Sequence, residues 1–409
     1  KLIKQKKMKN NLILGLAIVS MLFSCTTDDT GSIVINDNSD NSVTNNTTSG
    51  GTTTGQTIFL SGNYIENLTL DPINNYILNG PLIMTSGTTL TIPAGMTIKA
   101  LANGASVYIA ISQGAKIDAQ GTASDPIILT SNASSPAAGN WGGLILLGKA
   151  PINSVLEGAT STSEIGSLPY GGTDPADNSG TIQYLRVEYS GGAADGSSEN
   201  NGLSFYGVGN GTTVQYVESF EGKDDGFEFF GGTVEVNFLV SINNQDDSID
   251  WTEGFSGKIT NAYTKHGADH DHGIEADGYN SDYGNNASPK FWANPTLTNI
   301  TIIGNGSADV NNTSDAVRLR VGTKGTLNNI YIQGFQKGFQ IVGDAGDNPT
   351  GAWVLDGTLH VNDVTFNDVT PTLVQNNTTE IFTDADFLSG VGNATQTDYA
   401  TWGAGWTRE

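Results

Sequence analysis

The sequence predicts an all-β protein: a single right-handed parallel β-helix of about 22 residues per coil, with loop insertions. Three observations support this prediction. No amphipathic helix of useful length follows residue 57. Short runs of Val, Ile, Leu, Thr, Phe and Tyr are bounded instead by Gly, Asn and Asp, which are strand and turn signals. These runs also recur at a regular interval.

The interval is measured between the apolar residues that follow successive acidic or polar clusters. Their spacings are 24, 22, 25, 43 and 22 residues. A period near 22 predicts coils of three short strands and three turns, and the spacing of 43 indicates either two coils or one coil with an insertion. An antiparallel β-sandwich is the competing fold, but it predicts hairpin turns every 8–12 residues or so and no long-range repeat. The aligned positions are Leu203, Phe227, Ile249, Ile274, Val317 and Phe339.

The first 56 residues differ in composition from the rest. A basic start and the apolar run LILGLAIVSMLF predict a signal peptide in residues 1–24. The following residues to 56 are mostly Thr, Ser, Asn, Asp and Gly, which predicts a disordered tether in residues 25–56. We therefore expect one β-helix domain over residues 57–409. Its insertions are expected near residues 157–180, 278–295 and 344–352.

The end of the predicted signal peptide, LFSC, resembles a bacterial lipobox. Cys25 is the single cysteine of the chain, and the resemblance predicts that it is lipidated and anchored in the outer membrane. The acidic residues that follow at once in CTTDDT resemble the surface-export signal of Bacteroidota lipoproteins. We therefore expect an outer-membrane lipoprotein that is exposed on the cell surface.

The chain is strongly acidic, with 42 acidic and 18 basic residues. Five of the basic residues, and none of the acidic ones, precede Cys25. Such a charge excludes a basic surface that would bind nucleic acid. It favours cations, or ligands brought in by cations, as partners. The alternative interpretation is that the acidity only keeps a secreted protein soluble.

Several long motifs resemble a known family. GAKIDAQGTASDPIILTSN, GNWGGLILLGKAPIN, YGGTDPADNSGTIQYLRVEYSGG and DDGFEFFGGTV are similar to segments of Bacteroidota cell-surface lipoproteins with a right-handed, pectate-lyase-like parallel β-helix. The resemblance covers roughly residues 80–409, including the closing TWGAGWTRE. It implies this fold and a surface location, but it carries no well-established activity.

Strand alternation places one polar residue of each coil on the outer face, in a column. The column predicted from the spacing is Ser204, Glu228, Asp250, Glu275, Arg318 and Gln340. Carboxylates about 5 Å apart repel by about 1 kcal/mol in water and by roughly 3 kcal/mol at an effective dielectric of 20. A hard cation such as Ca²⁺ relieves this repulsion, whereas the alternative is that the side chains splay into water.

A second acidic set lies in the turn before each of these strands. It comprises Asp224–Asp225, Asp246–Asp247, Asp271–His272 and Ser314–Asp315. Such residues often bond backbone N–H groups and form a ladder of turns, but one acid per turn suffices for this. The doublets therefore leave a metal-binding role open. The predicted metal ligands from both sets are Asp225, Glu228, Asp247, Asp250 and Glu275.

Two loops carry further candidates. The stretch KHGADHDHGIEAD holds His266, His270 and His272, which predict either a zinc site or a polar loop. The insertion near 278–295 carries aromatic residues, which either bind a sugar or pack the loop onto the β-helix. The predicted ligand-binding residues are Tyr279, Tyr283, Trp292 and Arg318.

Three functions follow from these features. The first is a surface-anchored binding module for a glycan or a cation-bridged ligand, with Ca²⁺ in the acidic column and a TonB-dependent-type transporter as its partner. The second is a Ca²⁺-dependent polysaccharide lyase or a glycoside hydrolase. In a lyase, Glu228, Asp250 and Glu275 hold the metal and Arg318 or Arg320 is the base; in a hydrolase, Glu228 and Asp250 form the carboxylate pair. The third is a structural or adhesive surface protein.

Overall fold

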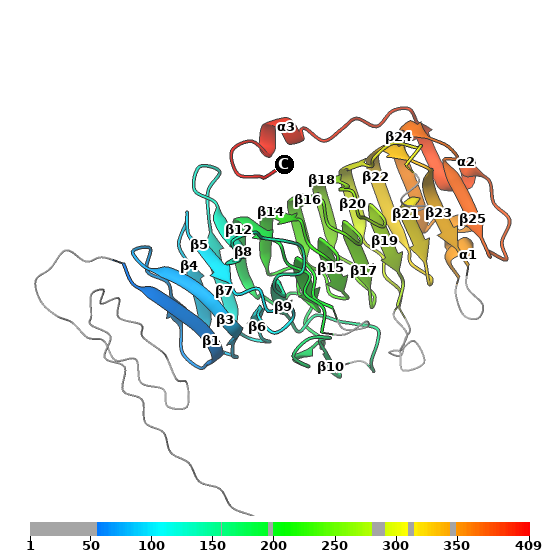
Figure 1. The fold of residues 1–409 in the computed structure, drawn as a ribbon. Coiled ribbons are helices and arrows are strands. Elements are labelled where there is room, and N and C mark those ends of the chain that lie inside the picture. The colour runs from blue at the N-terminus through cyan, green and yellow to red at the C-terminus, as the bar shows by residue number, and fades with distance from the viewer. Residues whose placement is uncertain (1–54, 157, 195–198, 280–290, 310–314, 344–348) are drawn as a thin grey trace, which may run out of the picture. The chain divides into compact units, whose positions relative to one another are not determined.

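A computed structural model describes residues 55–156, 158–194, 199–279, 291–309, 315–343 and 349–409. Within them, 24 strands form one parallel β-sheet that winds through successive coils, as predicted, and the arrangement is consistent with a right-handed parallel β-helix (Figure 1). A separate antiparallel hairpin pairs β10 (Ser161–Thr162) with β11 (Pro169–Tyr170). The described residues include no helix that is both long and apolar enough to cross a membrane.

The coils repeat two kinds of strand. The short strands are β9 (Leu144–Leu147), β13 (Leu203–Tyr206), β15 (Phe227–Phe230), β17 (Ile249–Thr252), β19 (Ile274–Asp277), β21 (Asp315–Arg320), β23 (Lys337–Val342) and β25 (Leu373–Asn376). The longer strands are β12 (Gly180–Glu188), β14 (Thr213–Phe220), β16 (Glu235–Ile242), β18 (Lys258–Lys265), β20 (Thr296–Ile303), β22 (Gly325–Phe335) and β24 (Leu359–Val369), and β26 (Leu388–Val391) pairs with β24.

The first coils and the helices complete the domain. The first strands are β1 (Thr57–Tyr64), β2 (Leu68–Thr69), β3 (Asn75–Met84), β4 (Thr89–Ile92), β5 (Thr97–Ala100), β6 (Ile109–Ile111), β7 (Lys116–Gln120) and β8 (Ile127–Ser131). Three short helices, α1 (Thr350–Leu355), α2 (Asp384–Phe387) and α3 (Tyr399–Trp402), follow β23, β25 and β26.

The register confirms the repeat and resolves the long interval. Phe227 pairs with Leu203 on one side and with Ile249 on the other. Ile274 pairs directly with Val317, so the spacing of 43 residues is one coil plus an insertion. Inward-facing rings stack from coil to coil, with the Phe205 and Phe229 rings 4.9 Å apart. Because every rung buries its apolar face only against its neighbours, the coils share one core.

Each coil from β12 to β24 has one bend where three turns per coil were expected. The longer strands continue through a single residue with positive φ, and this bend separates two of the three expected strands. The bend residues are Tyr184, Tyr216, Phe238, Asn261, Asn299, Asn329 and Asp363. Asparagine tolerates this left-handed conformation well. The Asn299 and Asn329 side chains also bond to the preceding rung: Asn299 donates to Asn261 at 3.1 Å, and Asn329 donates to Asn299 at 3.0 Å.

The C-terminal segment, residues 393–409, runs back along these bends as a strap across the coils (Figure 1). Its Thr395 bonds to the bend residue of β22, and Tyr399 stacks on Tyr263 of β18 with ring centres 4.0 Å apart. Trp406 is fully buried, edge-on to the stacked rings of β12 and β14. Arg408 donates its backbone N–H to the buried Glu218 carboxyl at 2.9 Å. The strap therefore joins coils that are far apart in the chain.

We expect Trp406→Ala to lower the free energy of unfolding by about 3–5 kcal/mol, because it empties a buried site of aromatic size. Urea unfolding followed by circular dichroism measures the change. The matched control is Trp402→Ala, which removes a half-buried ring of the same segment and is expected to have a smaller effect. Equal unfolding midpoints for wild type and Trp406→Ala would show that the strap is not docked in solution.

Candidate metal centre

A pocket of about 350 Å³ lies over the outer face of the short strands. Its walls come from β15, β17, β19 and β21, from the turns that precede these strands, and from two loops of the preceding part of the chain. Ten of the twelve lining residues are acidic, and the other two are arginines. They are Glu164, Glu199, Asp224, Asp225, Glu228, Asp246, Asp247, Asp250, Asp271, Glu275, Arg318 and Arg320.

The predicted outer column is present in register. Glu228 pairs with Asp250, Asp250 with Glu275, and Glu275 with Arg318. The two ends of the column, Ser204 and Gln340, pair as expected and are buried. The four charged residues between them are half-buried, so their side chains do not splay freely into water. The carboxylates therefore face one another in a walled pocket, where their repulsion is screened less than on an open surface.

The turn aspartates divide into two groups with different roles. The second of each doublet is buried and holds the next turn: Asp225 Oδ1 accepts the backbone N–H of Asp247 at 2.9 Å, and Asp247 Oδ1 accepts that of His272 at 2.6 Å. These bonds form the predicted ladder of turns, although they link neighbouring coils rather than closing each turn on itself. The first of each doublet, Asp224 and Asp246, is half-buried and lines the pocket.

The pKa values of five carboxyl groups in the pocket are raised, and the causes are shared. Burial, followed by the nearby carboxylates of Glu199 and Asp246, raises the pKa of Asp224 to about 8. Burial and then the neighbouring carboxylates also raise the pKa of Glu228 and Asp250 well above the usual range. The same causes act on Asp225 and Asp247. Such a pocket takes up protons or cations, because either reduces the repulsion.

The two arginines act at one end of the column. Arg318 Nη1 lies 3.3 Å from Glu275 Oε1, and Arg320 forms ion pairs with Glu275 and Asp277. Burial lowers the pKa of Arg320, but the Asp277 and Glu275 carboxylates outweigh this and leave the pKa above its ordinary value. A guanidinium in this setting is a poor candidate for a general base, which needs a lowered pKa.

Oxygen ligands converge at several points in the pocket. Four groups of three residues have potential ligand atoms within 4.8 Å of one another. All five predicted metal ligands belong to these groups, and oxygen donors in such sets are the ligands that Ca²⁺ prefers. Asp250 Oδ1 is buried and has no hydrogen-bond partner. The groups are Asp224–Asp225–Asp246, Asp225–Glu228–Asp250, Asp247–Asp250–Glu275 and Asp247–Asp271–His272.

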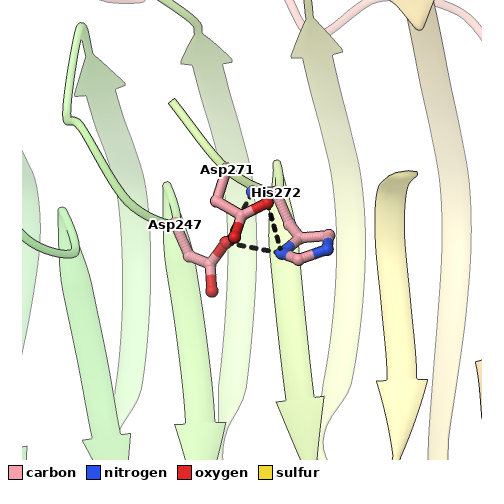
Figure 2. A group of neighbouring side chains, drawn as sticks. All are labelled: Asp247, Asp271 and His272. Carbon is pink, nitrogen blue, oxygen red and sulfur yellow. Dashed lines mark hydrogen bonds and ion pairs between the residues drawn. The ribbon is translucent and has the colours of Figure 1, made fainter. Parts of the chain in front are cut away.

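The last group contains the one histidine that joins the acidic residues (Figure 2). His272 Nδ1 lies 2.9 Å from Asp247 Oδ1, 3.4 Å from Asp271 Oδ1 and 3.6 Å from Glu275 Oε1. Burial nevertheless lowers the pKa of His272. A neutral imidazole beside these oxygens widens the choice of donor atoms at this edge of the pocket.

The predicted zinc site of three histidines does not form in the described part of the chain. His270 Nε2 lies 3.3 Å from Asp309 Oδ2, and its ring packs at a tilt against His266, with ring centres 4.2 Å apart. Burial lowers the pKa of His266 to about 3. Neither residue belongs to a group of converging ligands with His272.

The aromatic candidates lie apart from the pocket lining. Trp292 is half-buried, with ring centres 5.5 Å from Tyr279 and 6.3 Å from Trp353. Phe291 offers its backbone carbonyl to the buried Asn153 side chain at 2.8 Å. Phe291 and Trp292 therefore pack the end of the insertion onto the coils, as the structural alternative predicts. Tyr283 lies outside the described residues.

Sequence reasoning missed two residues of the pocket, Glu164 and Glu199, because both lie in loops with no strand register. Glu164 lies in the predicted insertion near residues 157–180, and Tyr170 packs this loop against the coils. The buried Tyr170 hydroxyl donates to Glu253 at 2.8 Å, and its ring contacts Tyr206 with centres 4.8 Å apart. A lone acid among Ser, Thr and Gly residues gave no signal that it would point toward the column.

Fold and pocket together define a parallel β-helix protein with an acidic, cation-attracting face. The chain belongs to the family of pectate-lyase-like β-helix domains, whose model matches residues 62–407. No curated protein sequence matches the chain significantly. The family assignment thus agrees with the predicted architecture.

Solved structures with some similarity are remote. The catalytic domain of a GH87 α-1,3-glucanase, in complex with tetrasaccharides, is 12% identical with a TM-score of 0.31. The match covers 83% of this chain but only 64% of that domain. The A-module of the Azotobacter vinelandii mannuronan C-5 epimerase AlgE6 is 12% identical, with coverage of 83% and 91% and a TM-score of 0.30. The Yersinia enterocolitica family 28 exopolygalacturonase is 12% identical, with coverage of 76% and 73% and a TM-score of 0.22.

The raised carboxyl pKa values predict an unusual pH dependence for the metal-free protein. A carboxyl group with a raised pKa in the folded state stabilises the fold at low pH, and this contribution is lost as the pH rises through the folded pKa. In EDTA, the free energy of unfolding is therefore expected to fall between about pH 4 and about pH 8 through these groups. The slope is up to about 1.4 kcal/mol per pH unit for each proton released.

Urea unfolding across this pH range measures the slope, and Asp224→Asn is expected to reduce it. The control is Glu66→Gln, which changes an exposed carboxyl far from the pocket lining. A slope that is the same in wild type and Asp224→Asn would contradict the role given to Asp224.

Proposed function

We propose that the protein is a surface-anchored binding module whose acidic pocket binds a hard divalent cation of the Ca²⁺ type and, through it, an anionic ligand. The observation that carries the proposal is the convergence of ten acidic side chains on one pocket, in which Asp250 Oδ1 is buried without a partner. Carboxylates in this number oppose folding unless protons or cations neutralise them.

The lining of the pocket favours a small inorganic cation. Every lining residue is charged, so the pocket offers no aromatic or aliphatic surface against which a sugar ring could stack. Carboxylate oxygens suit Ca²⁺ or Mg²⁺ better than they suit transition metals. Ca²⁺ fits better than Mg²⁺, because flexible sets of six to eight oxygens are its usual ligands and Mg²⁺ demands near-ideal octahedral geometry. A glycan would then bind through an acidic group that the cation bridges.

The cellular setting comes from the sequence alone. A lipid on Cys25, the tether of residues 25–56 and a place on the outer surface of the outer membrane would present the β-helix to ligands outside the cell. A TonB-dependent-type transporter is the partner that this setting suggests for a capture protein. Both the anchor and the partner belong to the proposal.

A lyase or glycoside hydrolase is the alternative, and the pocket chemistry favours it less. The ion pairs of Arg320 raise its pKa, which opposes its use as a base. Acid–base catalysis by two carboxyl groups needs environments that push their pKa values apart. The pKa values of Glu228 and Asp250 are instead both raised, and by the same causes. A structural role, in which the cation only holds the coils together, is the remaining alternative.

Calcium is expected to bind the full-length chain and to stabilise it. At a free Ca²⁺ concentration of 100 times Kd, the stabilisation is about 2.7 kcal/mol. Titration calorimetry and thermal unfolding with Ca²⁺ and with EDTA measure both effects. Asp250→Asn is expected to weaken Ca²⁺ binding at least tenfold, and Glu66→Gln to leave it unchanged. Unchanged melting in Ca²⁺ and EDTA, with no heat of binding, would refute the cation site.

An anionic polysaccharide is expected to bind only when Ca²⁺ is present. Polygalacturonate and alginate are suitable probes in a pull-down, with a neutral glucan as the matched control. Asp250→Asn should lose the Ca²⁺-dependent binding. Calcium stabilisation without binding to any polyanion would favour the structural alternative. Release of unsaturated sugar that is lost in Arg318→Ala would favour the lyase.

A further inference from the structure

We propose that the pocket holds two divalent cations at once, bridged by the carboxylate of Asp250. This inference rests on the proposed cation binding and adds the number of ions and their arrangement. The two sites are the triads Asp225–Glu228–Asp250, here called site I, and Asp247–Asp250–Glu275, here called site II. Asp250 is the member that they share.

Strand pairing separates the two sites along the coils. Glu228 and Glu275 both pair with Asp250, one on each side, so they lie two coils apart. Two coils correspond to roughly 10 Å. Two oxygens bound to one Ca²⁺ lie at most about 5 Å apart, because each Ca²⁺–oxygen distance is about 2.3–2.6 Å. Side chains can shorten this backbone separation, but Glu228 and Glu275 share no group of ligand atoms within 4.8 Å of one another, whereas each forms such a group with Asp250. This arrangement places one ion on each side of Asp250.

An unpartnered atom marks the shared position independently of the acidic composition. Asp250 Oδ1 is buried, has no hydrogen-bond partner and belongs to a residue that the pocket encloses. Buried polar atoms are mostly paired in folded proteins, and Asp250 Oδ1 is the one carboxylate oxygen of the described pocket lining that is buried without a partner. A bridging carboxylate binds one ion through each of its two oxygens. This arrangement explains why Asp250 has a carboxylate neighbour on each side.

The turn ladder prepares one further ligand for each site. Asp225 and Asp247 each use Oδ1 to accept a backbone N–H from the following coil. These bonds fix the orientation of each carboxylate, and a carboxylate has a second oxygen with which to bind a cation. Site I thus takes Asp225 and site II takes Asp247, from equivalent positions of successive coils.

The charges of the two sites match two ions better than one. The triads contain five carboxylates in total, and one divalent ion leaves three of these charges uncompensated. Two ions neutralise four of the five. Over the whole pocket lining, ten carboxylates, Arg318, Arg320 and two divalent ions leave a net charge of −4, whereas one ion leaves −6. The site I end has no lining cation of its own among the described residues.

The test is the number of ions bound by the full-length chain. Native mass spectrometry and elemental analysis after equilibrium dialysis against Ca²⁺ are expected to give two ions per chain. Luminescence energy transfer between Tb³⁺ and Eu³⁺ bound to the same molecule tests whether they are neighbours. Zero ions would overturn both the inference and the proposed function. One ion would overturn the inference and leave the proposed function standing.

Isosteric variants show which ion binds at site I and which binds at site II. Glu228→Gln is expected to lose the ion of site I and keep the other, and Glu275→Gln to lose the ion of site II and keep the other. Asp250→Asn is expected to weaken the binding of both ions at least tenfold and to abolish the lanthanide energy transfer. The control Glu66→Gln is expected to leave both unchanged. Circular dichroism in EDTA verifies that each variant is folded. Two ions that Asp250→Asn leaves unaffected, or that show no energy transfer, would overturn the bridged arrangement.

Discussion

In-register stacking of parallel strands is the constraint on which the rest of this structure depends. Successive coils lie about 4.8 Å apart, so each side chain has its counterpart from the next coil as its nearest neighbour. Where the repeated residue is aromatic, the result is favourable: the Tyr184 and Tyr216 rings lie 4.2 Å apart and nearly parallel. Where it is asparagine, the amides bond to one another. Where it is a carboxylate, stacking creates a repulsion that the fold cannot avoid by moving one residue.

That repulsion is also the source of the pocket's chemistry. An isolated surface carboxylate binds a cation weakly, because water already solvates it well. The carboxylates of Glu228, Asp250 and Glu275 are held side by side by backbone hydrogen bonds of the sheet and are partly shielded from water. A cation that enters removes an unfavourable interaction as well as forming new bonds. Pre-organisation of this kind leaves little ordering to be done on binding.

The sequence predicted what the repeat controls and failed where the repeat stops. The column from Ser204 to Gln340 was predicted residue by residue, because strand alternation and period determine it. The step from Glu275 to Arg318 was left open between two coils and one coil with an insertion, and only the register decided it. Glu164 and Glu199 were missed, because the position of a loop depends on distant packing such as that of Tyr170. The ring nitrogens of the three histidines do not converge, in line with the polar-loop alternative, because closeness in sequence within a loop does not bring ring nitrogens together.

The C-terminal strap has a consequence for the order of folding. Its final contacts, from Arg186 to the Trp406 carbonyl and from Arg408 to Glu188, join residues 220 positions apart. Coils can form one after another through local contacts, but these closing contacts require almost the whole domain to be present. Contacts of such long range form slowly, because the intervening chain has to be ordered first. The aromatic bends of β12 and β14 therefore stay uncovered until the strap docks, which makes them the surface that a chaperone assisting this fold would have to shield.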